Sequence, residues 1–144
     1  EILKHSESLI IVDDYGHHPI EIQATLSTAK QVWPERRLVV IFQPHRYSRT
    51  EQQMKSFFSA FNDADQLLLL DIYSAGEEVI EEVHSQRIAE GVKNFGHKNV
   101  EYIGCAEFVV PYLTKILKPG DVVMALGAGN IGELSHKLTS HFKD

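Results

Sequence analysis

A continuous apolar run, Leu38-Val39-Val40-Ile41-Phe42, constrains the fold more than any other stretch of this sequence. Its character is β-branched and no polar residue interrupts it, which is typical of a strand covered on both faces. Such cover is found where helices pack on both sides of a parallel sheet. We therefore expect a central strand here.

Strand-like and helix-like patterns alternate along the rest of the chain. Further strands are predicted at residues 8–12, 66–71, 99–103 and 122–126. Helices are predicted at residues 19–33, from a Thr50/Gln53 capping box onward, at 85–95 with Phe95 facing inward, at 107–117 and from 131 onward. Residues 72–83 are expected to form a mobile loop. This alternation predicts an α/β fold with a mostly parallel open sheet and helices on both faces, similar to the Rossmann fold.

Composition narrows the class of protein. A chain of 144 residues is expected to form one domain, and a net charge of −6 with a pI near 5.7 argues against nucleic acid as the main partner. No apolar run has the length of a membrane span, so no membrane partner is expected. Cys105 is the single cysteine, which favours a cytoplasmic location. The chain begins at Glu1, and we expect it to be part of a longer protein.

A polar stretch, Asp13-Asp14-Tyr15-Gly16-His17-His18-Pro19, joins the first predicted strand to the first predicted helix. Loops at the carboxyl ends of parallel strands collect ligands, because their side chains and the free N–H groups of the next helix converge there. An aspartate here can accept hydrogen bonds from a ribose, and an imidazole can face a phosphate. The alternative is that Asp13 or Asp14 caps the helix and both histidines are solvated.

The two adjacent histidines do not predict a metal site. On an extended stretch His17 and His18 are expected to point apart, and no cysteine or paired acid accompanies them at ligand spacing. We therefore predict that this chain binds no metal.

The loop after the central strand carries Arg46 and Arg49 just before a predicted helix. Two guanidinium groups beside a helix N-terminus suit a carboxylate or a phosphate, and each charge-assisted hydrogen bond contributes about 1.5 to 3 kcal/mol when shielded from water. The alternative is that these are surface arginines that pair with Glu51 or with nothing.

A glycine pattern, Gly127-Ala128-Gly129-Asn130-Ile131-Gly132, follows the last predicted strand and matches the dinucleotide-binding motif. That motif requires a further strand with an acid about twenty residues on, and the sequence ends before that point. A tight turn that lets the backbone approach a ligand or a neighbouring domain is the preferred interpretation.

Four segments together resemble a known family. They are DDYGHHPIEI at 13–22, IFQPHRYSRT at 41–50, LDIYSAGE at 70–77 and LGAGNIG at 126–132. In order and spacing they are similar to the carboxyl-terminal domain of the Mur ligases, and the second segment resembles the branch that adds L-alanine to UDP-N-acetylmuramate in peptidoglycan synthesis. The resemblance covers nearly the whole chain.

The resemblance implies an ATP-dependent amide-bond ligase of three domains. One domain binds the UDP-sugar, a central one holds ATP and Mg²⁺ through a P-loop, and the third brings the amino acid and closes over ATP. In the chemistry of the family, the muramate carboxylate becomes an acyl phosphate that the alanine amine attacks. Residues 1–144 resemble only the third domain and contain no P-loop, so the fragment alone is not expected to catalyse.

The resemblance also assigns roles to residues. Asp14 would bind the ribose of ATP, Tyr15 would lie near the nucleotide, and His17 would face the phosphate end as the catalytic residue. The residues that would surround the amino acid are His45, Arg46 and Arg49.

Two other functions stay open at this point. A murein tripeptide ligase that recycles cell-wall peptides has a similar first motif and usually differs at the second. A non-catalytic nucleotide-binding module is favoured by the glycine pattern at 127–132.

Overall fold

The computed structural model of the chain describes residues 1–142 and contains one six-stranded sheet. The strands are β1 (Ile2–His5), β2 (Leu9–Asp14), β3 (Leu38–Phe42), β4 (Gln66–Leu70), β5 (Val100–Gly104) and β6 (Asp121–Leu126). They lie in the order β1-β2-β6-β3-β4-β5, and all neighbours are parallel except β1 and β2. The predicted class and the predicted central strand are confirmed.

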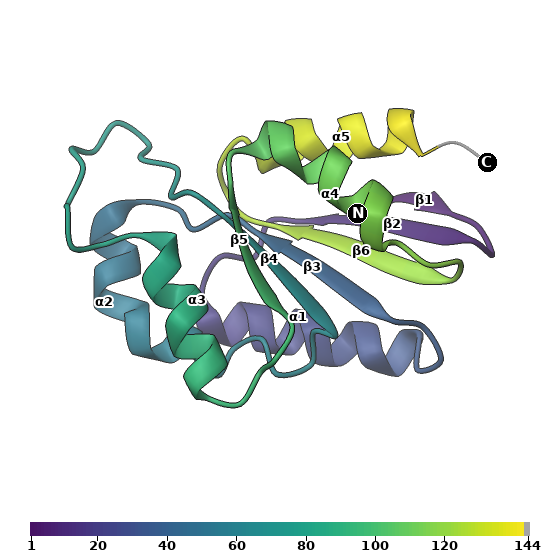
Figure 1. Cartoon of the computed structure of the whole chain (residues 1–144), viewed down its shortest axis with the longest axis horizontal. Helices are drawn as coiled ribbons and strands as arrows, with labels where there is room; N and C mark the ends of the chain where they lie inside the picture. Colours follow the sequence, from purple (N-terminus) through teal and green to yellow (C-terminus); the bar gives the residue numbers. More distant parts are fainter. Residues whose placement is uncertain (143–144) are drawn as a thin grey trace.

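Helices cover both faces of the sheet (Figure 1). They are α1 (Pro19–Val32), α2 (Tyr47–Phe57), α3 (Ser85–Asn94), α4 (Val109–Ile116) and α5 (Ile131–His141), with a short 3-10 turn at Ala106–Phe108. In Figure 1, α1, α2 and α3 lie below the sheet, and α4 and α5 lie above it. The expectation of a doubly covered sheet is therefore also confirmed.

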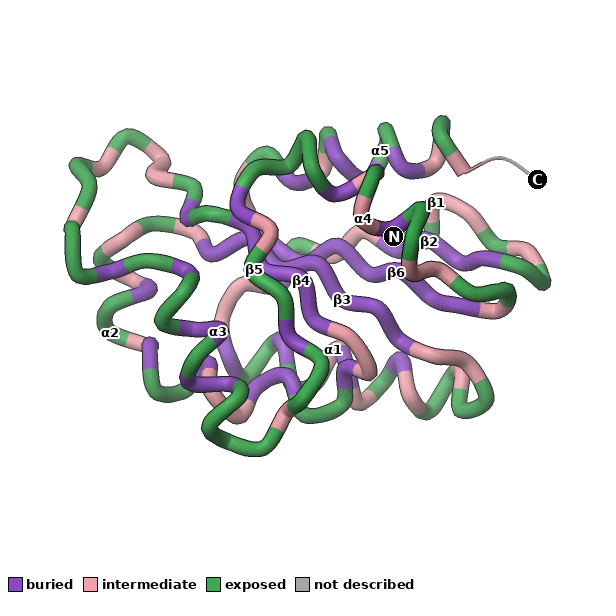
Figure 2. Tube along the Cα trace, viewed as in Figure 1, coloured by how far each residue is buried: buried purple, intermediate pink, exposed green. Residues whose placement is uncertain are grey.

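Alternate residues of each central strand enter two separate cores. In β3, Val40 and Phe42 pack with α1, α2 and α3, whereas Val39 and Ile41 pack with α4 and α5. Figure 2 shows the resulting buried sheet between exposed helix surfaces. The ring of Phe42 lies 5.3 Å from that of Phe57, and burial of each such ring contributes about 1.5 to 3 kcal/mol. The two cores fix β3 in register, so the loop after it has a defined position.

Three predictions about the elements are wrong. β1 is not predicted, because its four residues, Ile2-Leu3-Lys4-His5, lack the alternation of apolar and polar residues that marks a strand, and it pairs antiparallel at the edge. α2 begins at Tyr47, so Thr50 and Gln53 form no capping box. Phe95 is 62% exposed, because α3 ends at Asn94 and Phe95 lies beyond its buried stripe.

Pro111 fits the fourth helix because it is the third residue of α4. An N–H group in the first turn has no intrahelical partner, so proline removes no bond there. Among residues 1–142, no helix combines the length and the apolar character that crossing a bilayer requires.

A buried carboxylate joins the amino ends of β3 and β6. Asp121 is 2% exposed and accepts two hydrogen bonds from the Arg37 guanidinium, at 3.1 and 2.6 Å, and a third from the backbone N–H of Lys118 at 2.9 Å. Arg37 also donates to the carbonyl of Ile116 at 2.7 Å. These bonds raise the pKa of Arg37 and tie both strands to the end of α4.

Removing this arginine is expected to destabilise the fold. Arg37→Ala leaves Asp121 buried without its counter-charge, which costs about 3 to 5 kcal/mol for a buried pair and somewhat less here because Arg37 is partly exposed. Chemical denaturation measures the loss. Arg36→Ala is the matched control, since Arg36 makes a single 3.3 Å bond to the Gly120 carbonyl. Equal losses from both variants would contradict this account.

Candidate functional site

Three loops meet at the carboxyl edge of β2, β6 and β3, as their order in the sheet requires. We call residues 13–18, 43–49 and 127–130 the rim. The backbone N–H of Gly127 donates to the carbonyl of Asp14 at 3.1 Å, and that of Gln43 donates to Leu126 at 3.1 Å. The three loops are therefore hydrogen-bonded neighbours.

Asp14 shapes its own loop. Its Oδ1 accepts the backbone N–H of Gly16 at 2.8 Å, and a Cβ at position 16 would come within 2.9 Å of this oxygen. The other carboxylate oxygen of Asp14 has no hydrogen-bond partner within residues 1–142. Tyr15, next to it, is 72% exposed. The loop thus presents one aspartate oxygen and one open aromatic ring.

Neither aspartate caps α1, so that alternative is wrong. Asp13 accepts a hydrogen bond from Ser135 on α5 at 2.8 Å, and the N-cap residue is His18. The Glu21 carboxylate satisfies the helix start instead, accepting the N–H groups of His18 at 3.1 Å and His17 at 3.4 Å. The N–H of His18 is the main cause of a lowered pKa at Glu21.

The two histidines lie side by side, so the prediction that they point apart is wrong. Their ring centroids are 4.6 Å apart, and both side chains are partly buried. His18 itself has an extended backbone, with φ −84° and ψ 144°, but it is the N-cap of α1, and the chain turns into the helix directly after it. Potential ligand atoms of His17, His18 and Glu21 all lie within 4.8 Å of one another.

This cluster does not suit Mg²⁺. Magnesium prefers octahedral oxygen ligands, and two of these three ligands are imidazoles. Glu21 already serves the helix start, and Gln53 binds the Nδ1 atom of His18. That this chain binds no metal stays a prediction.

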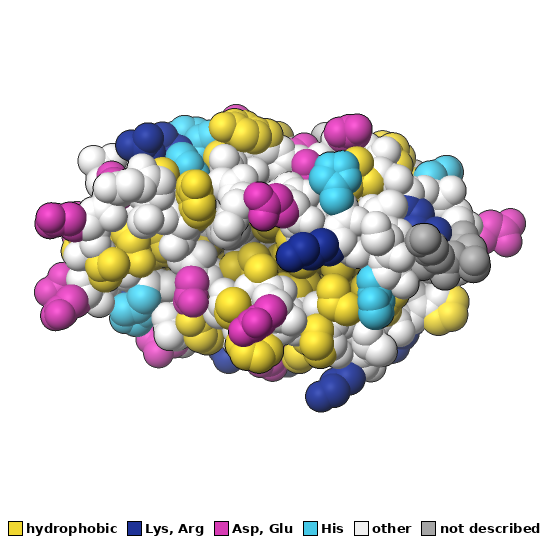
Figure 3. Space-filling model, turned by 90° about the horizontal axis from the view of Figure 1, so that it is seen from above, with side chains coloured by type: hydrophobic (Ala, Val, Ile, Leu, Met, Phe, Trp, Pro, Cys, Tyr) yellow, Lys and Arg dark blue, Asp and Glu magenta, His cyan; other side chains and the backbone are white. Residues whose placement is uncertain are grey.

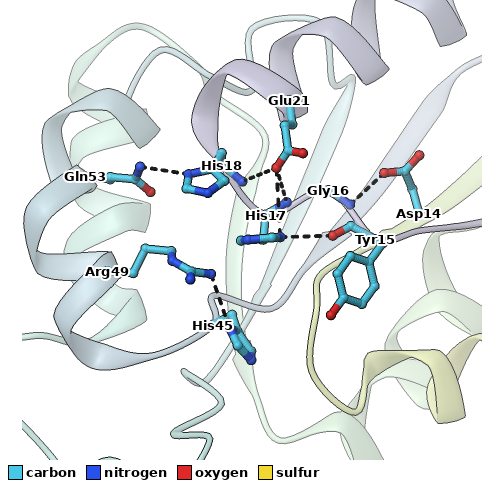
Figure 4. A network of polar contacts seen from close by, with 9 residues as sticks. All are labelled: Asp14, Tyr15, Gly16, His17, His18, Glu21, His45, Arg49 and Gln53. Atoms are coloured by element: carbon cyan, nitrogen blue, oxygen red, sulfur yellow. Dashed lines mark hydrogen bonds and ion pairs between the residues drawn. The ribbon is translucent and has the colours of Figure 1, made fainter.

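Side chains bridge the first two loops (Figure 4). Gln53 on α2 contacts Nδ1 of His18 through its Nε2 at 2.9 Å, and the rings of His17 and His45 lie 6.0 Å apart. Figure 4 shows His17 between Tyr15 and the His45–Arg49 pair, whereas the Asp14 carboxylate lies on the far side of its loop and binds the N–H of Gly16. His17 of the first loop therefore faces the same region as His45 and Arg49 of the second.

A cationic group forms the second side of the rim. Arg49 is partly buried and donates from Nη1 to Nδ1 of His45 at 3.4 Å, whereas Arg46 is exposed. Within residues 1–142 neither arginine forms an ion pair, so the pairing with Glu51 is not observed. The other form of that alternative, a surface arginine without an ion pair, describes Arg46. Figure 3 shows basic and histidine side chains together at the end of the molecule that carries α2.

Burial lowers the pKa of His45, and the nearby Arg49, His17 and Arg46 lower it further. Because Arg49 donates to Nδ1, the neutral ring carries its proton on Nε2. His45 is therefore a neutral hydrogen-bonding group beside two guanidinium groups at neutral pH.

The glycine loop packs against the loop after β3. A Cβ at Gly129 would meet the Tyr73 ring at 2.7 Å and Oε1 of Gln43 at 2.8 Å, and Gly127 has a φ of 156°. That Oε1 is buried and has no hydrogen-bond partner within residues 1–142, while Nε2 of Gln43 donates to Asn130 at 2.8 Å. The glycines thus permit close packing between loops.

A sequence profile described as "Mur ligase, glutamate ligase domain" matches residues 1–129. The chain belongs to the Mur ligase family. A UDP-N-acetylmuramate--L-alanine ligase of Geobacter sulfurreducens is 53% identical over 123 residues, and the enzyme of that name from Geotalea uraniireducens is 51% identical over 135. These matches cover 85% and 94% of this Mur ligase chain but 27% and 29% of the relatives.

Solved structures show the same fold as this Mur ligase chain. The UDP-N-acetylmuramate-alanine ligase of Thermotoga maritima matches with a TM-score of 0.79 at 27% identity, over 97% of this chain and 28% of that one. A murein peptide ligase from Psychrobacter arcticus matches with a TM-score of 0.78 at 19% identity, over 97% of this chain and 28% of that one, which shows the fold alone. The chain spans less than a third of the length of the relatives named here.

Sequence reasoning missed several residues that organise the rim of this Mur ligase chain. They are Glu21, Gln43, Gln53, Tyr73 and Glu77. Glu21 had a local signal, because a glutamate three residues after a helix start is a capping pattern. The others act on residues distant in sequence, and a single sequence gives no signal for such pairs.

The pKa of His45 offers a direct test of the rim geometry. Arg49→Gln is expected to raise this pKa toward its ordinary range, because it removes the guanidinium that faces the ring. The ring stays buried in the variant, so its pKa is expected to stay somewhat below the ordinary value. An NMR titration of the imidazole measures the change, and Lys55→Gln on the exposed side of α2 is the control. An unchanged His45 pKa in Arg49→Gln would contradict the observed contact.

Proposed function

We propose that this chain is the amino-acid- and ATP-closing domain of an ATP-dependent ligase that adds L-alanine to UDP-N-acetylmuramate in peptidoglycan synthesis. The observation that carries the proposal is the rim, where His17 of one loop and His45 and Arg49 of the next face one region. Asp14 and Arg46 lie on the same two loops. The names of relatives about half identical to the chain support the substrate assignment. We expect such an enzyme to lie in the cytoplasm, because its substrates are ATP and a UDP-sugar.

The cationic side of the rim suits the carboxylate of an amino acid. Arg49 and Arg46 form no direct ion pair within residues 1–142, although the charge of Glu77 acts on Arg46. Guanidinium groups bind carboxylates through two parallel hydrogen bonds. Nε2–H of neutral His45 supplies another donor nearby. Holding the carboxylate in this way leaves the amine free to approach an acyl carbon, and such orientation lowers the barrier to amide formation.

The opposite side of the rim suits ATP. The unpartnered oxygen of Asp14 can accept a ribose hydroxyl, and the exposed ring of Tyr15 lies beside it. ATP supplies the phosphoryl group that activates the muramate carboxylate. His17, 6.0 Å from the His45 ring, lies between the nucleotide side and the amino-acid side. We assign it to the phosphate end, as the catalytic residue that contacts the reacting group.

The rest of the enzyme is expected to lie in domains beyond this chain. Residues 1–144 contain no P-loop, and the relatives are more than three times as long as the matched region. The central domain would hold Mg²⁺, which agrees with the nitrogen-rich cluster at His17 and His18. The isolated fragment is therefore expected to be inactive until a central domain closes over the rim and excludes water.

Two substitutions in the full-length enzyme test the assignment. Arg49→Ala is expected to raise the KM for alanine by on the order of 10- to 100-fold, because one charge-assisted contact to the carboxylate is lost, with a much smaller change for ATP. Asp14→Ala is expected to raise the KM for ATP instead. Steady-state assays with each substrate varied measure both effects. An unchanged alanine dependence in Arg49→Ala removes the amino-acid assignment, and equal loss for both substrates in Asp14→Ala indicates misfolding.

Two further measurements separate this function from its alternatives. Turnover of a murein tripeptide in place of alanine by the full-length protein would identify a recycling ligase. Tight binding of ATP to the isolated chain by calorimetry would favour a self-sufficient nucleotide-binding module, because the ligase assignment gives this domain only part of the nucleotide contacts.

A further inference from the structure

The segment between β4 and α3 is fastened to the cationic side of the rim. We call residues 71–84 the acidic loop, since they include Asp71, Glu77, Glu78, Glu81 and Glu82. Near its start, the backbone N–H of Tyr73 donates to Pro44 at 2.9 Å, and that of Arg46 donates to Tyr73 at 2.8 Å. The Tyr73 ring also stacks on His45 with a centroid distance of 5.7 Å. The mobility of residues 72–83 stays a prediction, but the start of this loop is attached to the rim by specific contacts.

Glu77 makes the second attachment. One carboxylate oxygen accepts the backbone N–H of Ser48 at 3.1 Å, and the other accepts the Ser48 hydroxyl at 2.5 Å. Ser48 is the second residue of α2, so this N–H is one that the helix itself leaves without a partner. The carboxylate caps the helix from another part of the chain, and its charge is favourable at that terminus.

Backbone strain is concentrated at the same place. Arg46, with φ 71°, and Ala75, with φ 51°, are the non-glycine residues with positive φ in the described chain. Each costs on the order of 1 to 2 kcal/mol relative to ordinary backbone. Ala75 and Gly76 form the turn that delivers Glu77, closed by a 3.0 Å bond from the N–H of Glu77 to the Ser74 carbonyl. Such conformations persist where surrounding contacts hold them.

The two sides of Arg46 are held by different residues, and its carbonyl accepts the N–H and the hydroxyl of Thr50 at 3.2 and 2.7 Å. Its side chain is exposed, and as the N-cap residue of α2 it makes no side-chain cap. Its N–H is held by Tyr73, and the helix turn that follows it is held by Glu77. The Ser48 bonds and the charge of Arg46 both lower the pKa of Glu77, so the carboxylate stays ionised at neutral pH.

We propose that Glu77 is a positioning residue, which through its two hydrogen bonds to Ser48 holds Arg46 and the start of α2 in the conformation that receives the amino-acid carboxylate. This inference rests on the function proposed above and deepens it. Glu77 does not touch the substrate. It acts by keeping the arginines oriented toward the substrate carboxylate. Its loss is therefore expected to weaken binding of the amino acid more than the use of ATP.

The test uses the full-length ligase. Glu77→Ala is expected to raise the KM for alanine on the order of tenfold, with kcat and the KM for ATP within about twofold, because only the geometry of the carboxylate contacts is relaxed. Glu77→Gln keeps an acceptor for the Ser48 N–H, so its KM is expected to lie between wild type and Glu77→Ala. Glu78→Ala is the matched control, since it removes the same charge from an exposed neighbour in the same loop.

Three kinetic results would overturn the proposal. One is an alanine KM in Glu77→Ala that is unchanged or lowered, the latter meaning that the carboxylate competes with the substrate. Another is a Glu77→Gln variant as impaired as Glu77→Ala. The third is a Glu78→Ala variant as impaired as Glu77→Ala, since general charge and not the hydrogen bonds would then decide the effect.

Hydrogen exchange of the full-length variants tests the attachment without substrate. In Glu77→Ala, amide exchange at residues 47–49 and 74–77 is expected to accelerate at least severalfold relative to Glu78→Ala, and equal exchange overturns the proposal. The two hypotheses fail differently. If Arg49→Ala raises the alanine KM and Glu77→Ala does not, the positioning role has failed alone. If exchange accelerates but neither variant changes alanine use, the proposed function has failed.

Discussion

The burial of β3 on both faces, beside β6 and β2, is the constraint on which the rim depends. Val40 and Phe42 enter one core while Val39 and Ile41 enter the other, so a slip of one residue would exchange the two sets. Parallel pairing of β2 with β6 and of β6 with β3 then brings three loops to one edge. Side chains far apart in sequence meet there without contributing to the core themselves.

The rim is organised by backbone groups as much as by its charged side chains. Glu21 accepts two N–H groups at the start of α1, Glu77 accepts one at the start of α2, and Asp14 accepts one within its own turn. Each acid satisfies donors that a helix start or a turn leaves free. The groups assigned to substrates, including Arg49 and the second oxygen of Asp14, stay available because other residues perform this structural work.

Much of the fold, and the loops that carry the rim, could be predicted from the sequence, for reasons specific to each segment. The run at 38–42 required a doubly covered strand, and Pro19 marked a helix start, because both signals are local. β1 is not predictable from its own four residues, which do not alternate, because only their pairing with β2 makes them a strand. The orientation of His17 and His18 depends on where the helix begins, and the link from Glu77 to Ser48 spans 29 residues. Contacts of this kind depend on tertiary geometry, which local patterns do not encode.

The guanidinium groups of Arg46 and Arg49 beside His45 form no direct ion pair within residues 1–142, and this has a consequence for selectivity. In the free domain these like charges repel one another, and a bound anion relieves that repulsion while a neutral amine does not. Mobile salt ions screen the same field, so the grip on a small anion weakens as ionic strength rises. If the function proposed above holds, the domain would select the charge of its ligand before the shape of the ligand's side chain has any effect.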